Sequence, residues 1–251
     1  MIGFIARFEF RRLFLSPLAW TLMAGLQFIL ALLFLVFLEN FITELQPKLA
    51  VIADAPGATD TVIAPLLVWA GILWLGVMPL LTMRSFSEER LYQRQALLMS
   101  APVSITEVVL GKYLGLLLFL ISALLPLLVT TASLSLGTSL DWGKLSAGFL
   151  GLFLMLASFS AAGLFLSTLS RQPALAAGLT YGLLALLFVF FVSGKSQGSE
   201  SALFIYLSHF GHFLSLNSGL VHSSDVLYFV LFSTGFLILT VQRLDSERRN
   251  G

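Results

Sequence analysis

Six long apolar blocks, separated by shorter polar segments, set the pattern of this chain. A helix needs roughly 17–25 residues to cross the hydrocarbon core of a bilayer, and each block reaches that length. None alternates apolar and polar residues with a period of two, as the strands of a membrane barrel do. The pattern therefore predicts an all-α integral membrane protein of one domain with six transmembrane helices. The expected spans cover about residues 17–38, 62–83, 113–134, 145–169, 174–193 and 226–242.

An amphipathic segment, about residues 2–15, precedes the first span. Its apolar residues Phe4, Phe8 and Leu15 recur at helical spacing. This spacing predicts a helix that lies at the membrane interface with its basic residues near anionic head groups. The alternative is the ordinary basic flank of a first span. The residues expected to contact the membrane surface are Arg7, Arg11 and Arg12.

The basic residues divide unevenly between the two sides of the predicted membrane. Short cytoplasmic segments carry an excess of Lys and Arg, so the richer side is expected to be the cytoplasm. That side holds both termini and the connection between the second and third spans. Eleven of the 14 basic residues lie on it: Arg7, Arg11, Arg12, Arg84, Arg90, Arg94, Lys112, Arg171, Arg243, Arg248 and Arg249.

A compact charged segment connects the second and third spans. Ser85 is followed three residues later by Glu88, which fits the capping box that starts many helices. Nothing breaks a helix from there until Pro102 stops it. We therefore predict a cytoplasmic helix over about residues 85–100.

This predicted helix carries charge without local partners. Arg84 and Glu88 are its only opposite charges at i,i+4 spacing, and their order is the less favourable one. An apolar stripe and unpaired charges are typical of a helix that lies in the groove of another protein; the alternative is a solvated loop helix. The predicted partner contacts are Ser85, Glu88, Glu89, Arg90, Leu91, Arg94 and Leu98.

Composition narrows the function classes. The chain is 58% hydrophobic and 11% charged, with a net charge of +1, so it offers no basic surface for nucleic acid. It has no cysteine, which excludes disulfides and thiolate metal sites. Between the ends of the predicted spans there is no Asp, Glu, Lys, Arg or His. Ion-coupled carriers usually place such residues in the membrane, so the pattern argues against a proton- or sodium-coupled carrier.

The spans carry small and helix-bending residues instead. Pro79 and Pro126 are expected to kink their helices, and Gln27 to form a hydrogen bond between helices. Small residues four apart let helix backbones approach closely, which favours packing within one subunit, or alternatively a dimer face. These pairs are Gly111 and Gly115, Ala157 and Ala161, Ser158 and Ala162, and Gly178 and Gly182.

Two stretches resemble a known family. The run EERLYQRQALLMSAPVSITEVVLGKYLG (88–115) resembles the signature of type 2 ABC-transporter permeases, and the C-terminal run 209–249 is similar to the gliding-motility-associated branch of that family. The family usually has Gly-Thr where this chain has Gln93 and Arg94. The first run matches at Leu97, Leu98, Met99, Ser100, Pro102, Val103, Ser104, Glu107, Gly111, Lys112 and Leu114, and the second at His209, Phe210, Gly219, Asp225, Tyr228 and Phe229.

The resemblance implies a permease subunit of an ATP-driven exporter or mechanotransmitting complex in the bacterial inner membrane. Two copies, or this chain and a related permease, would pair above two cytoplasmic ATPase subunits, which bind ATP and Mg. The helix at 85–100 would be the coupling helix that docks on the ATPase. A periplasmic auxiliary protein is a further possible partner. The alternative is a non-transporting membrane scaffold that anchors cytoplasmic and external partners.

The chain carries no nucleotide-binding motif and is expected to be non-catalytic. The stretch SGKS at 193–196 has Val189 where a phosphate-binding loop needs its first Gly. The predicted external loop, about residues 194–225, holds the three histidines His209, His212 and His222. His-x-x-His spacing makes them metal candidates. Anchoring of an interfacial loop beside aromatic residues is the favoured interpretation.

Overall fold

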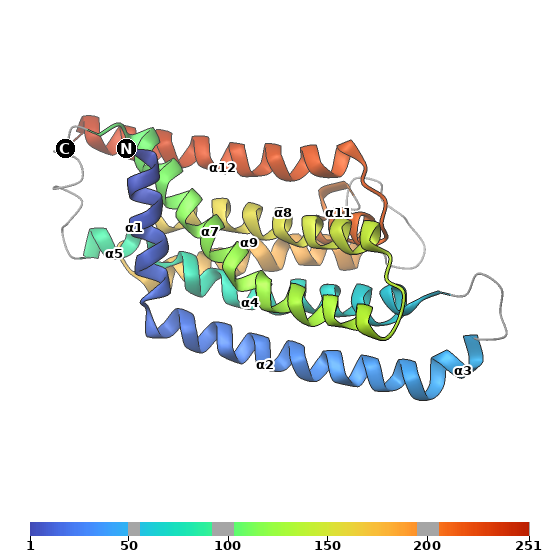
Figure 1. Cartoon of the computed structure of the whole chain (residues 1–251). Coiled ribbons are helices and arrows are strands. Elements are labelled where there is room, and N and C mark those ends of the chain that lie inside the picture. The colour runs from blue at the N-terminus through green and yellow to red at the C-terminus, as the bar shows by residue number, and fades with distance from the viewer. Residues whose placement is uncertain (50–55, 92–102, 195–205, 251) are drawn as a thin grey trace.

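A computed structural model describes residues 1–49, 56–91, 103–194 and 206–250, and every regular element in these ranges is a helix (Figure 1). Six of the helices are long and apolar enough to cross a membrane, which confirms the number of predicted spans. The elements are α1 (Ile2–Phe14), α2 (Pro17–Asn40), η1 (Phe41–Leu45), α3 (Gln46–Leu49), η2 (Thr59–Ile63), α4 (Ala64–Thr82), α5 (Arg84–Leu91), α7 (Ile105–Ala132), η3 (Ser133–Leu136), α8 (Trp142–Ser167), α9 (Pro173–Gly194), α11 (His209–Asn217) and α12 (Ser223–Asn250).

The most buried helix is α8, which packs against α4, α7, α9, α11 and α12. Its small residues make this possible, because they let neighbouring helices come close. A methyl group placed on Gly163 would lie 2.6 Å from Thr82 Cβ, and one on Gly151 would lie 2.8 Å from Leu216 Cβ. Two of the predicted small-residue pairs, at 157/161 and 158/162, are buried in this helix. They therefore serve packing within the subunit.

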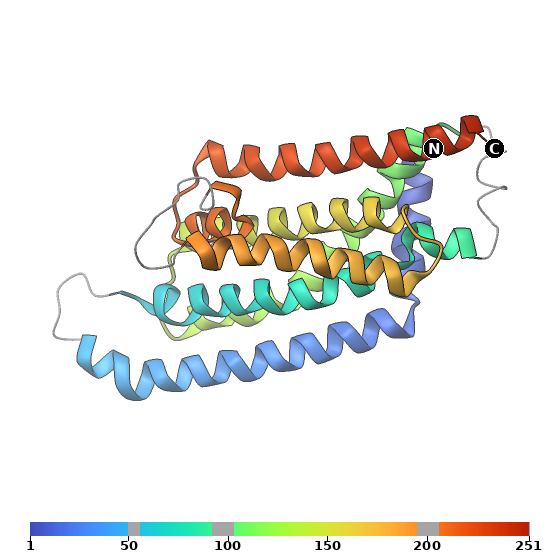
Figure 2. The same ribbon diagram turned by 180° about the vertical axis from the view of Figure 1, so that it is seen from behind.

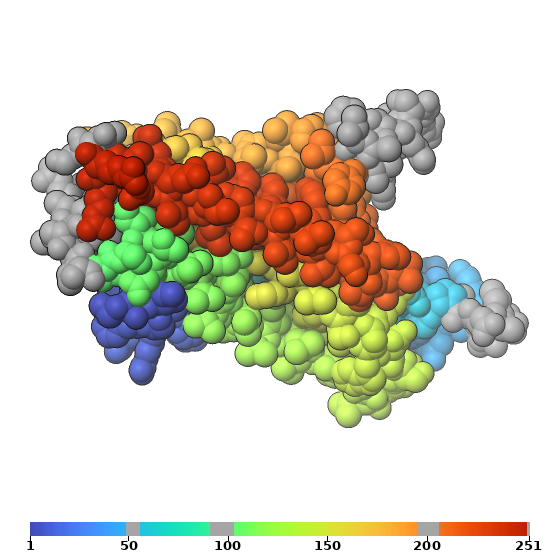
Figure 3. All heavy atoms as spheres, turned by 90° about the horizontal axis from the view of Figure 1, so that it is seen from above, coloured from blue at the N-terminus to red at the C-terminus, as the bar shows by residue number. Residues whose placement is uncertain are grey.

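The outer spans cover this centre only partly. Figure 3 shows α12 running along one face of the bundle, and Figure 2 shows α2 along the opposite face, with α9 at the front between them. Large apolar side chains such as Phe28, Leu186 and Leu231 are exposed on these helices. In a protein whose spans match the bilayer thickness, such surfaces face lipid. The chain is thus an all-α protein built for a membrane.

The two spans that contain an internal proline, α4 with Pro79 and α7 with Pro126, each accept a side-chain hydrogen bond from a neighbouring span. A proline inside a helix cannot donate a hydrogen bond, and its ring crowds the preceding turn. Gln27 Nε2 donates to the carbonyl of Ala123, three residues before Pro126, over 2.7 Å. The hydroxyl of Tyr181 donates to the carbonyl of Gly76, three residues before Pro79. The expected interhelical role of Gln27 is confirmed, whereas the matching role of Tyr181 was not predicted.

Both chain ends and α5 lie at the same end of the bundle (Figure 1), which we call the terminal end; α3 and α11 lie at the other end. At the terminal end α1 runs across the long axis of the spans and packs against the start of α7. The third span begins earlier than predicted, since α7 starts at Ile105 rather than near residue 113. Lys112 and Glu107 therefore lie inside α7, ahead of residue 113, and the predicted apolar span 113–134 still contains no charged residue.

Candidate functional site: an ionic cluster at the terminal end

The contact between α1 and α7 depends on two glycines one turn apart in α7. A Cβ atom on Gly111 would lie 2.6 Å from Ile5 Cβ, and one on Gly115 would lie 2.6 Å from Glu9 Cβ and 2.9 Å from the Ala6 carbonyl. Real side chains at these positions would push α1 away from α7. This glycine pair therefore brings the two helices together within the subunit, as the favoured interpretation predicted.

Between these glycines stands Lys112, the centre of the cluster. Its side chain is only 3% exposed, and its ammonium nitrogen lies 2.6 Å from Glu89 Oε1 and 2.8 Å from the Ser85 carbonyl oxygen. The same nitrogen lies 3.7 Å from Glu9 Oε2 and 4.9 Å from the centre of the Phe86 ring. A buried ammonium is stable only when its donors meet acceptors, and two carboxylates and a carbonyl provide them here.

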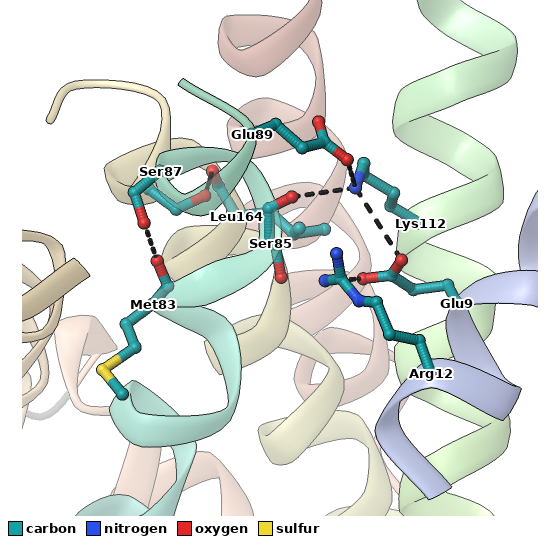
Figure 4. Close-up of polar contacts among 9 residues, drawn as sticks. Glu9, Arg12, Met83, Ser85, Ser87, Glu89, Lys112 and Leu164 are labelled. Carbon is teal, nitrogen blue, oxygen red and sulfur yellow. Dashed lines mark hydrogen bonds and ion pairs between the residues drawn. The ribbon is translucent and has the colours of Figure 1, made fainter. Parts of the chain in front are cut away.

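A second cation of the cluster, Arg12, lies on α1. Arg12 Nη2 lies 2.6 Å from Glu9 Oε1, so Glu9 lies between the two cations (Figure 4). Glu9 is 2% exposed, which makes it the most deeply buried carboxylate in these contacts. Arg12, Glu9, Lys112 and Glu89 together carry no net charge. Such mutual compensation is what allows ionised groups to remain in a water-poor site.

A separate ion pair fixes α5 on its other side. Arg90 Nη2 lies 2.6 Å from Glu247 Oε2 on α12, and the Arg90 side chain is 9% exposed. Glu247 also lies 3.3 Å from Arg243 Nε, one turn earlier on α12. Since α5 continues α4 almost without a break, this short helix links the second span to α1, α7 and α12. We call these residues, Glu9, Arg12, Glu89, Arg90, Lys112, Arg243 and Glu247, the terminal ionic cluster.

The cluster changes the interpretation of the charged segment. Glu89 and Arg90 were expected to lack local partners, and the structure pairs both with distant parts of the chain instead. Ser85 is buried and is the second residue of α5, so the predicted capping box at Ser85 and Glu88 is also wrong. Its hydroxyl has no hydrogen-bond partner among the residues that the structure describes. The contact of these residues with a partner protein stays a prediction, and so do the contacts assigned to Leu91, Arg94 and Leu98, whose side chains lie outside the described residues.

A true capping box starts α7 instead. The Ser104 hydroxyl accepts a hydrogen bond from the Glu107 backbone N–H at 3.2 Å, and Glu107 Oε2 accepts one from the Ser104 N–H at 3.2 Å. Ser104-x-x-Glu107 has the sequence of such a box, so the signal was available. It fixes where α7 begins and therefore how far Lys112 stands from the helix start.

The exposed face of α1 agrees with the predicted surface helix. Phe4, Phe8, Arg7 and Arg11 are exposed, while the opposite face packs on α7. Arg12 differs, because its guanidinium turns toward Glu9 and is only 31% exposed. The contact of Arg7, Arg11 and Arg12 with lipid head groups stays a prediction.

The histidines lie at the other end and do not converge on a metal position. His212 Nδ1 lies 2.7 Å from Asp225 Oδ1, and its Nε2 lies 2.8 Å from the Tyr206 carbonyl, so both ring nitrogens are engaged. His222 is exposed. No group of three potential metal ligands occurs in the described ranges. Rather than anchoring a loop at the interface, His209 and His212 are buried in α11, a helix within the segment predicted as a loop.

His209 is enclosed by aromatic rings. Its Nδ1 lies 2.8 Å from the Tyr228 hydroxyl, and the rings of Phe159 and Phe232 lie 5.6 Å and 4.3 Å from it, centre to centre. Burial, followed by the nearby charge of His212, lowers the pKa of His209 from 6.5 to about 3. His209 is therefore neutral at physiological pH and belongs to the apolar packing of this end of the bundle.

Comparison with models of protein families and with curated proteins finds no match to this chain. The fold and the terminal ionic cluster therefore define only a class of protein: a multi-span α-helical membrane protein in which ion pairs join the first helix, the extension of the second span and the last span.

Proposed function

We propose that this chain is the permease subunit of an ATP-driven ABC transporter, either an exporter or a mechanotransmitting complex, driven by a separate ATPase subunit. The observation that carries the proposal is the double attachment of α5, through Glu89 to Lys112 and through Arg90 to Glu247. A force applied to α5 or to the segment that follows it would act on four helices together, because ion pairs and continuous helix connect them.

The resemblance to type 2 ABC permeases supplies the partner. Its motif includes Gly111 and Lys112, which are the residues that hold α1 and α5 against α7. In this proposal the terminal end of the bundle is cytoplasmic, because it holds most of the basic residues. The ATPase would bind at α5 and the residues after it, and the bilayer-embedded part would contain no catalytic group.

The test is to isolate the full-length tagged chain from its native membrane and ask whether an ATPase co-elutes. Glu89 and Arg90 are poor probes of docking, because their substitution would disturb the bundle itself. We expect Arg94→Glu combined with Leu98→Glu to reduce the co-eluting ATPase at least about tenfold, as loss of a charge contact and an apolar anchor would. Arg249→Glu is the matched control, since Arg249 is 78% exposed at the same end.

The outcomes separate the proposal from its alternative. Retention of the ATPase by the control and its loss in the double variant supports a permease driven at this segment. Recovery of other proteins without any ATPase supports the scaffold function. ATP hydrolysis by the purified chain alone would contradict both.

A further inference from the structure

A cavity of about 290 Å³ opens at the terminal end, beneath the elbow between α1 and α2 and against the junction of α4 and α5. Its walls come from α1, α2, α4 and α5, and the terminal ionic cluster holds α1 and α5 in place. The lining residues are Arg12, Leu13, Ser16, Leu18, Ala19, Leu80, Leu81, Arg84, Glu88 and Glu89. The volume is at the lower limit of small-molecule pockets, enough for a polar head group but not for a whole two-chain lipid.

The lining changes from apolar to ionic along the cavity. Leu18, Ala19 and Leu80 belong to the starts or ends of membrane-length helices. Arg84 and Glu88 belong to α5, beyond the end of α4. The boundary of a lipid leaflet has the same order, with acyl chains on one side and charged head groups on the other. The cavity is therefore placed and polarised for an amphiphile of the surrounding membrane.

Two charges in this lining have no ion-pair or hydrogen-bond partner in the described part of the chain: Arg84 and Glu88. The other two charged residues are already engaged, Arg12 by Glu9 and Glu89 by Lys112. A guanidinium binds phosphate through paired N–H donors, and a carboxylate accepts hydrogen bonds from a primary ammonium. The cavity thus offers one free site for an anion and one for a cation, a turn apart on α5.

We propose that this cavity binds the head group of a phospholipid that carries both a phosphate and a primary amine, of the phosphatidylethanolamine type. Arg84 holds the phosphate, and Glu88 accepts hydrogen bonds from the ammonium. The acyl chains leave between α2 and α4, over Leu18 and Leu80. This binding does not depend on an ATPase partner, so it is tested independently of the proposed function.

Other head groups satisfy only part of this arrangement. A phosphatidylcholine head group has a cation without N–H donors, and a phosphatidylglycerol head group has no cation. A choline head group would leave Glu88 without a hydrogen-bonded partner, and the hydroxyls of a glycerol head group would offer it only neutral donors, whose hydrogen bonds are weaker than that of an ammonium. A hydrogen bond between charged groups is worth enough to change affinity by about tenfold, so discrimination of this size is expected.

The experiment uses the full-length chain, purified in detergent and stripped of lipid, and measures binding of short-chain lipids by native mass spectrometry. We expect the ethanolamine lipid to bind about tenfold more tightly than the choline and glycerol lipids. Glu88→Gln should remove this preference while phosphate-dependent binding remains. Arg84→Ala should weaken binding of all three lipids, and the exposed Arg249→Ala should change none.

Two further arms make the result decisive. Glycerophosphoethanolamine, which has the head group without acyl chains, should bind at least about tenfold more weakly than the lipid, because it forfeits the apolar contacts. Equal binding of this soluble molecule would overturn the assignment to a membrane lipid. Equal affinity for the three lipids, or an ethanolamine preference that survives Glu88→Gln, would overturn the proposed site. Tryptophan fluorescence of each variant establishes that it is folded.

Discussion

Lys112 gives the sharpest test of the terminal ionic cluster. Substitution of Lys112 by Met keeps a long flexible side chain but removes the ammonium that lies 2.6 Å from Glu89 and 3.7 Å from Glu9. Glu9 keeps Arg12 as a partner, whereas Glu89 loses its only ion pair in the described part of the chain. Leaving one charge of a buried pair unpaired costs about 3–5 kcal/mol of unfolding free energy.

The lower end of this range applies here, because Glu89 is 18% exposed and gains some water when the ammonium is removed. A loss of about 3 kcal/mol corresponds to a fall in Tm of roughly 6–12 °C for a chain of this length. The measurement is thermal unfolding of the detergent-solubilised protein, followed by the fluorescence of tryptophans such as the buried Trp74.

A double-mutant cycle separates lost pairing from lost packing. The variant Glu89→Gln with Lys112→Met removes both charges, and we expect it to recover more than half of the lost Tm, since replacing a whole buried pair is often nearly neutral. Lys48→Met is the matched control, because Lys48 pairs with Glu44 while 72% exposed, and we expect no measurable shift. A small effect of Lys112→Met, or no recovery in the double variant, would refute the electrostatic account.

Three further predictions test other parts of the bundle. Gly115→Ala should destabilise the protein by about 1–3 kcal/mol and expose α1 to protease, because the new methyl group would collide with Glu9 and the backbone of α1. Gly178→Ala is the control and should leave stability unchanged, because a methyl group there has nothing within 4 Å. Tyr181→Phe should lower the unfolding free energy by about 1 kcal/mol in thermal denaturation, through loss of one interhelical hydrogen bond. His209 stays neutral in the folded protein down to about pH 3, whereas in the unfolded chain it is protonated below about pH 6.5. Its contribution to stability is therefore complete above pH 6.5 and is lost as the pH falls toward 3. We expect the Tm of the wild type to drop more steeply over that range than the Tm of His209→Gln.

The spans could be predicted from the sequence because hydrophobic length alone decides whether a helix crosses a bilayer. The starts of α2 and α9 were accurate to a residue, since Pro17 and Pro173 stand at the first helical position. The start of α7 was missed because Lys112 was taken as the polar flank of the span. Its charge is compensated by Glu89 and Glu9, which lie 23 and 103 positions away in the sequence, and no local sequence pattern predicts such pairing.

The same limitation explains the errors in the candidate site. The i,i+4 rule searches only one helix, so it left Glu89 and Arg90 without partners when those partners stood on α7 and α12. Glu9 was not singled out, although a lone carboxylate among the arginines of a surface helix was a usable signal. The helix α11 was also missed, although Ser208 caps it and Phe210, Phe213 and Leu216 repeat at helical spacing.

The hydrogen bonds beside the two prolines also constrain the order of biogenesis. The Gly76 carbonyl accepts its hydrogen bond from Tyr181, which is synthesised 105 residues later. The Ala123 carbonyl accepts from Gln27, which is synthesised 96 residues earlier. At a synthesis rate of 5–20 residues per second, α4 spends about 5–20 s in the bilayer before Tyr181 is made. During that interval the Gly76 carbonyl in α4 must rely on water, lipid or the insertion machinery, so chains truncated before α9 should be preferred substrates of membrane quality-control proteases.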